Sequence, residues 1–153
     1  MQEIHGNLKA PNLFYVCVDA RIRRDGSGRL YQGSEKEGYI FDNEYHLLKI
    51  MENFLEQNNF PQPSVQFRKF RETEKRRERV EKVARGENIS QQKGTKGTFV
   101  VHVQYRQNAT WQGEVLWVEK KDSQKFRSAL ELLKLMDNAL DRTETNTEKG
   151  ETV

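Results

Sequence analysis

Alternating hydrophobic and polar residues predict strands in two parts of the chain, and a helical period follows each of them. In FVVHVQYR at 99–106, Phe99, Val101, Val103 and Tyr105 alternate with His102, Gln104 and Arg106, which is typical of a strand with one buried face. A polar turn ends at Gly113, or at Gly28 in the matching earlier stretch, where glycine permits a positive φ, and EVLWVE predicts a second strand. A short third strand or turn leads to Phe126. The helix FRSALELLKLMDNAL comes next, with Ser128 as its expected N-cap.

The same order of elements is expected in residues 14–55, because this stretch aligns without a gap with residues 99–140. Asp42 or Asn43 takes the N-cap position before the helix EYHLLKIMENFLEQ. A shared pattern of apolar positions would not explain the matched Arg, Gly, Lys and Asn residues, so we predict an internal repeat. The identical residues are Phe14, Val16, Val18, Arg21, Gly28, Phe41, Leu47, Leu48, Lys49, Met51, Asn53 and Leu55, matched by Phe99, Val101, Val103, Arg106, Gly113, Phe126, Leu132, Leu133, Lys134, Met136, Asn138 and Leu140.

These elements predict an α+β fold built from two β-β-(β)-α units. A lone hairpin cannot bury its apolar face, so we expect one antiparallel sheet of four to six strands with both helices packed on it. The predicted domain spans 1–140, with repeat A at 14–55 and repeat B at 99–140. The apolar stripes expected to face the sheet are Leu130, Leu133, Met136 and Leu140 in one helix, and Tyr45, Leu48, Met51 and Leu55 in the other.

A basic connector at 61–97 separates the two units. Pro61 and Pro63 end the first helix, and Glu–Lys and Glu–Arg pairs at i, i+4 predict a second helix over 68–85. Residues 65–86 hold nine Lys/Arg and four Glu, a net of +5, so the rest of the +3 chain carries about −2. Residues 86–97 are predicted to form a flexible loop, and 141–153, which lack apolar anchors, a disordered tail.

Catalytic chemistry finds little support in the sequence. His5, His46 and His102 are scattered, no Cys/His/carboxylate spacing indicates a metal, and no glycine-rich phosphate loop is present. We therefore predict no enzyme activity, no catalytic residue, no metal and no cofactor. The lone Cys17 within an apolar strand, the lack of a signal peptide and the lack of a long apolar run favour a cytoplasmic protein that does not contact a membrane.

The turn QNATWQG at 107–113 is the most distinctive candidate contact surface. Asn108, Thr110, Trp111 and Gln112 supply hydrogen-bond donors and an indole, a set that suits an unknown protein or a small ligand. The alternative is that Trp111 packs into the core and Asn108 turns the chain through its tolerance of the left-handed region. The first copy has no tryptophan in its turn, which favours a specialised role. The resulting hypothesis is a non-enzymatic binding or regulatory module.

Nucleic-acid binding is the alternative function. A helix at 68–85 with many cations would meet a phosphate backbone. Interleaved glutamates, however, are more typical of a solvated helix laced with salt bridges. The residues that would carry this activity are Arg68, Lys69, Arg71, Lys75, Arg76, Arg77 and Arg79.

Residues 98–140, which contain RQNATWQG and FRSALEL, resemble a segment of small bacterial proteins of uncharacterised function in which this turn and this helix occur together. The resemblance covers only the C-terminal half and implies a bacterial, cytoplasmic setting. The family brings no known activity, so the resemblance assigns no functional residue.

Overall fold

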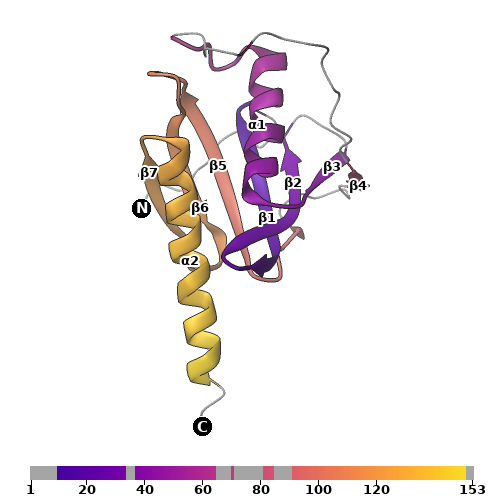
Figure 1. Cartoon of the computed structure of the whole chain (residues 1–153), viewed down its shortest axis with the longest axis vertical. Helices are drawn as coiled ribbons and strands as arrows, with labels where there is room; N and C mark the ends of the chain where they lie inside the picture. Colours follow the sequence, from indigo (N-terminus) through magenta and orange to yellow (C-terminus); the bar gives the residue numbers. More distant parts are fainter. Residues whose placement is uncertain (1–9, 34–36, 65–69, 71–80, 85–90, 151–153) are drawn as a thin grey trace.

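The computed structural model describes residues 10–33, 37–64, 70, 81–84 and 91–150. They form one seven-stranded antiparallel sheet in the order β4-β3-β2-β1-β5-β6-β7. Two helices lie on one face of this sheet (Figure 1). In chain order the elements are β1 (Leu13–Ile22), β2 (Asp25–Gln32), β3 (Glu37–Phe41), α1 (Glu44–Asn58), β4 (Lys82–Ala84), β5 (Gly97–Tyr105), β6 (Gln112–Trp117), a 3₁₀ turn (Val118–Lys120), β7 (Asp122–Phe126) and α2 (Ala129–Gly150).

The α+β prediction is confirmed at the level of one antiparallel sheet and two helices. The sheet has more strands than expected, because both third strands and the short β4 pair into it. Both predicted N-caps are present: the side chain of Asn43 accepts from His46 N at 2.8 Å, and that of Ser128 accepts from Glu131 N at 3.0 Å. These bonds satisfy amide groups that the first turn of each helix leaves free.

β1 and β5 pair at the centre of the sheet, where Phe14 lies opposite Val101 and Val16 lies opposite Phe99. In the repeat alignment, which offsets the chain by 85 residues, Phe14 corresponds to Phe99 and Val16 to Val101. Each of these two cross-strand pairs therefore corresponds to the other. A bulge interrupts β1 between Val18 and Ala20, and another interrupts β5 between Val103 and Tyr105. Each strand of the central pair thus carries a bulge near its C-terminal end.

Gly28 and Gly113 lie inside strands, and the expectation of a positive φ at these glycines is wrong. A Cβ on Gly28 would lie 1.9 Å from the carbonyl oxygen of Cys17, and one on Gly113 would lie 1.9 Å from that of His102. Glycine is needed here because two backbones approach closely. The left-handed residues of the two turns are instead Arg23 and Arg24, with φ of 52° and 66°, and Asn108 and Ala109, with φ of 52° and 57°.

The main core fills the space between the sheet and the helices. Leu47, Met51 and Leu55 of α1 pack there, as do Leu132, Met136 and Leu140 of α2. The predicted stripes are wrong at their first residues, since Leu130 is 60% exposed and Tyr45 is 68% exposed. A smaller cluster lies apart from this core and contains Leu13, Tyr15, Cys17, Tyr31 and Val100.

Two predictions about the connector and the tail are corrected. Lys82–Ala84 form strand β4 beside β3, so the predicted helix over 68–85 is wrong at these residues; 68–69, 71–80 and 85 lie outside the described residues. The tail is helical rather than disordered as far as Gly150. Asp141 binds Arg21 at 2.8 Å, and the Thr145 hydroxyl donates to the carbonyl oxygen of Asp141 at 2.9 Å. Such contacts stabilise this end of the helix without apolar anchors. Within the described part of the chain, neither helix is long and apolar enough to cross a membrane.

Candidate functional site

The hairpin between β5 and β6 is closed by its own polar side chains. Thr110 N donates to the Gln107 carbonyl at 3.0 Å, which closes a turn with Asn108 and Ala109 in the left-handed region. The Gln112 amide bonds the backbone of Gln107 twice, as acceptor and as donor, at 2.9 Å each. The predicted left-handed conformation of Asn108 is confirmed, and Gln112 fixes the turn.

Trp111 and Thr110 also have partners inside the protein. The Trp111 side chain is 5% exposed and belongs to the main core, so its indole is not a surface contact. This is the packing alternative that the sequence left open. The Thr110 hydroxyl accepts from Ala129 N at 3.1 Å, at the first residue of α2. Of the four predicted contact residues, Asn108 alone is exposed at the tip of the turn.

Arg106 joins the hairpin to the segment that follows α1. It is 7% exposed, and its Nε donates to the carbonyl oxygen of Pro61. Ser64 N donates to the Arg106 carbonyl at 3.0 Å, and Pro63 forms a bridge with the same residue. A buried guanidinium needs such acceptors to offset its lost hydration. These bonds hold residues 60–64 against the end of β5.

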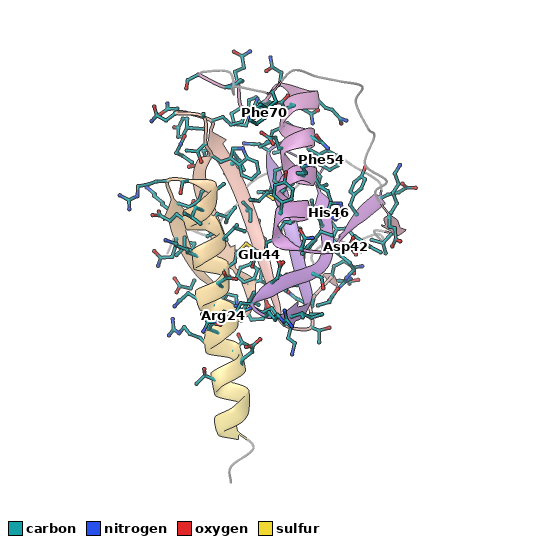
Figure 2. The ribbon with its side chains drawn as sticks, viewed as in Figure 1. Arg24, Asp42, Glu44, His46, Phe54 and Phe70 are labelled. Atoms are coloured by element: carbon teal, nitrogen blue, oxygen red, sulfur yellow. The ribbon has the colours of Figure 1, made fainter. Side chains whose placement is uncertain are left out.

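Two exposed aromatic side chains flank this junction. Phe60 precedes Pro61 and is 48% exposed, while Tyr105 precedes Arg106 and is 58% exposed. Phe70 is fully exposed and lies at the end of the molecule where α1 ends (Figure 2). We call Phe60, Phe70 and Tyr105 the aromatic end. The seven basic residues predicted to bind nucleic acid lie outside the described residues.

Arg21, the counterpart of Arg106 in the repeat alignment, lies in a different environment. Its side chain is 3% exposed and forms ion pairs with Asp137 at 3.5 Å, Asp141 at 2.8 Å and Glu144 at 3.5 Å, all on α2. The spacing of these acids at i, i+4 and i+7 on one helix face is a signal that the sequence analysis missed. The cluster ties the first hairpin to α2.

Glu44 adds a proton-sharing contact to this cluster. Burial raises the pKa of the Glu44 carboxyl to about 8, helped by its hydrogen bond to Asp137 and by the charges of Asp137 and Asp25. The raised pKa favours the protonated form of Glu44, whose carboxyl then donates a hydrogen bond to Asp137. Figure 2 shows Glu44 at the beginning of α1, on the side toward α2.

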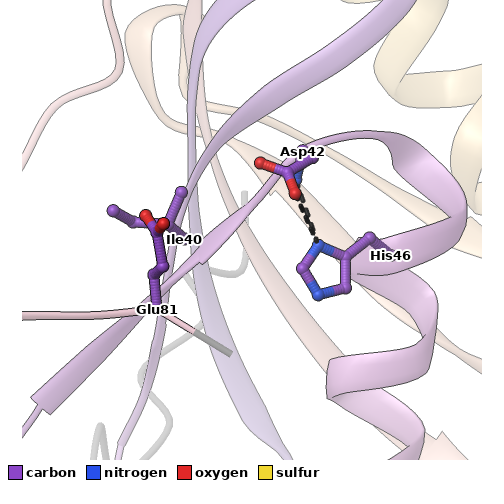
Figure 3. A pocket seen from close by; sticks show the side chains of 4 residues that line it. All are labelled: Ile40, Asp42, His46 and Glu81. Atoms are coloured by element: carbon purple, nitrogen blue, oxygen red, sulfur yellow. Dashed lines mark hydrogen bonds and ion pairs between the residues drawn. The ribbon is translucent and has the colours of Figure 1, made fainter. Parts of the chain in front are cut away.

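A cavity of about 400 Å³ lies at the junction of β3, β4 and α1 (Figure 3). His46 and Asp42 line one side, and Ile40 and Glu81 lie across from them. The amide of Asp42 donates to His46 Nδ1 at 3.1 Å. In the described part of the chain, no three His, Cys, Asp or Glu side chains form a group that could hold a metal ion.

No protein-family model, curated protein or solved structure matches the chain. The resemblance of residues 98–140 to small bacterial proteins therefore stays a prediction.

Proposed function

We propose that the protein is a non-enzymatic binding module that docks a partner protein on its aromatic end. The observation that carries this proposal is the junction at Arg106, which holds Phe60 and Tyr105 exposed on a fixed scaffold. Rigid aromatic side chains bury a large area with little loss of conformational freedom, which is why they serve as interface anchors. The proposed contact surface still includes the predicted hairpin, but its anchors are Tyr105 and Phe60 rather than Trp111.

The proposal rests on the difference between this end and the rest of the surface. Ile22, Tyr45 and Leu130 are also large, apolar and exposed, but they lie on three separate elements. Isolated exposed residues of this kind are normal in soluble proteins. Phe60 and Tyr105, in contrast, adjoin two residues that bond each other directly.

We also infer that the two halves are copies of one β-β-β-α unit. The matching bulges, left-handed turn residues, close-approach glycines and N-caps support this inference. In such a duplicated chain, Arg21 and Arg106 have diverged: one pairs with acids on α2 and the other bonds the segment after α1. We place the protein in the cytoplasm, where the buried, unpaired thiol of Cys17 fits a reducing environment.

Comparative recovery of partners from the native cells tests the docking surface. A tagged chain with Phe60→Ser and Tyr105→Ser should lose proteins that the unchanged chain retains. The matched control carries Ile22→Ser and Leu130→Ser, which remove two other exposed apolar side chains elsewhere. Retention of the same proteins by all three chains, measured by quantitative mass spectrometry, would contradict the proposal.

A further inference from the structure

The outer edge of β7 is open in the described sheet. β7 pairs with β6 on one side, from Gly113 opposite Phe126 to Trp117 opposite Asp122, and it ends the strand order on the other side. Figure 1 shows β7 at the margin of the sheet, with α2 lying across the same region. An open edge presents backbone amide and carbonyl groups that another extended chain can pair with.

The corresponding edge in the first half of the chain is occupied. β3 is the third strand before α1, as β7 is the third strand before α2, and β3 pairs with β4. β4 is an extended segment of three residues whose Val83 packs beside the smaller apolar cluster. The carbonyl oxygen of Glu81 also accepts from Ile40 N at 2.8 Å. This fold thus already accepts a short antiparallel segment at such an edge.

A pocket of about 160 Å³ lies between β7 and α2. Its apolar lining comes from Phe99 of β5, Val115 and Trp117 of β6, and Leu135 and Ala139 of α2. Asp122 and Gln124 of β7 line it at the sheet margin. A cavity of about 150 Å³ accommodates a molecule the size of benzene. The pocket therefore has room for one aliphatic side chain of a segment that runs beside β7.

The surface around this edge is mainly basic. Lys120 and Lys121 precede β7, Lys125 lies on it, and Lys134 and Arg142 project from α2; all five side chains are exposed. Acids lie nearby as well: Asp122 lines the pocket itself, Glu119 lies on the same stretch of chain, and Glu114 of β6 lies opposite Lys125. Arg127 is already paired with Glu131 at 3.1 Å. A segment bound here meets more positive than negative charge, which selects for acidic partners.

We propose that the groove between β7 and α2 binds an extended acidic segment of a partner protein, which pairs antiparallel with β7 and places one aliphatic side chain in the pocket. Backbone pairing supplies affinity in this mode of recognition, and the pocket and the lysines supply selectivity. The site is separate from the aromatic end, so the outcome of its test does not depend on whether the proposed function is correct.

Selection from a displayed library of random nine-residue peptides against the full-length protein tests this assignment. We expect the enriched peptides to be acidic and to carry an aliphatic residue, and to bind at least about tenfold more weakly to a chain with Lys125→Glu and Arg142→Glu. The matched control is Arg23→Glu with Lys82→Glu, which makes the same change of net charge at exposed cations in the β1–β2 turn and on β4, at the opposite edge of the sheet. Enriched peptides without acidic character, or equal losses in both variants, would overturn the proposal.

Amide hydrogen exchange with an enriched peptide bound locates the contact. Protection of amides within β7 is the expected result. Protection confined to the hairpin at 105–112 would overturn the groove assignment while supporting the aromatic end. Analytical ultracentrifugation tests whether a second copy of the chain occupies the edge. A dimer of the unchanged chain that is lost in the Lys125→Glu and Arg142→Glu chain would show this, and it would also overturn the acidic-segment assignment.

Discussion

Replacing Trp111 with alanine separates a packing role from a surface role. The side chain is 5% exposed and lies in the core between sheet and helices. Burying about 250 Å² of tryptophan at about 25 cal/mol per Å² gives an upper limit of about 6 kcal/mol. The alanine methyl stays buried and the unfolded chain is itself partly compact, so we expect the free energy of unfolding to fall by about 3–5 kcal/mol.

Denaturant unfolding followed by far-UV circular dichroism measures this loss without relying on the fluorescence of the replaced indole. Asn108→Gly is the control in the same turn, because glycine adopts the φ of 52° found there; its free energy of unfolding should change by less than about 0.5 kcal/mol. A Trp111→Ala chain that loses less than about 1 kcal/mol would refute the packing argument, because a surface substitution costs no more than that.

Three further outcomes follow from the close-approach glycine, the Glu44 pKa and the protein-binding account. Gly113→Ala should cost more than about 4 kcal/mol or prevent folding, because its Cβ would lie 1.9 Å from the backbone oxygen of His102; urea unfolding measures this. The unchanged chain should lose stability as pH rises from about 4.5 to about 8, because only the folded chain keeps the Glu44 proton in that window. Glu44→Gln should remove this loss, and denaturant unfolding measured across the same pH range tests it. A labelled single-stranded oligonucleotide at low salt should bind the unchanged chain no more tightly than an Arg76→Glu, Arg77→Glu chain, as fluorescence polarisation would show.

Each outcome has a result that contradicts it. Gly26→Ala is the control for Gly113, since its Cβ would lie 3.3 Å from the Val18 side chain and 4.0 Å from the Ala20 carbonyl oxygen; equal losses in both variants would show that the close approach does not matter. An unchanged pH slope in Glu44→Gln would mean that the Glu44 carboxyl does not hold the extra proton. Oligonucleotide affinity that falls steeply with salt and is lost in the double variant would support nucleic-acid binding instead.

Local patterns predicted the central elements well. The alternation in FVVHVQYR gave β5, and the caps Asn43 and Ser128 marked where α1 and α2 begin, because strand periodicity and helix capping are properties of neighbouring residues. The sequence pattern identified Gly113 as important, but the requirement for glycine at this position comes from the carbonyl of His102 on the neighbouring strand. That contact is set by strand register and is invisible in a local window.

The candidate site needed tertiary contacts that the sequence does not display. Trp111 lies in a polar turn, so its burial depends on how the hairpin folds against the helices. Arg106 lies in a polar stretch of sequence, yet its side chain is buried. Its guanidinium donates a hydrogen bond to the carbonyl oxygen of Pro61, which is distant in sequence. Asp141 and Glu144, two of the three acids that pair with Arg21, were treated as part of a disordered tail, because a search for apolar anchors overlooks a helix held by ion pairs.

Site-specific photo-crosslinking in the native cells tests the binding account most directly. A benzophenone amino acid at position 105, where Tyr105 is 58% exposed, is compared with the same group at position 22, where Ile22 is 73% exposed. The account predicts a discrete protein adduct at position 105 that is absent at position 22. Equal adducts at both positions, or none at position 105 in a chain of unchanged stability, would contradict it.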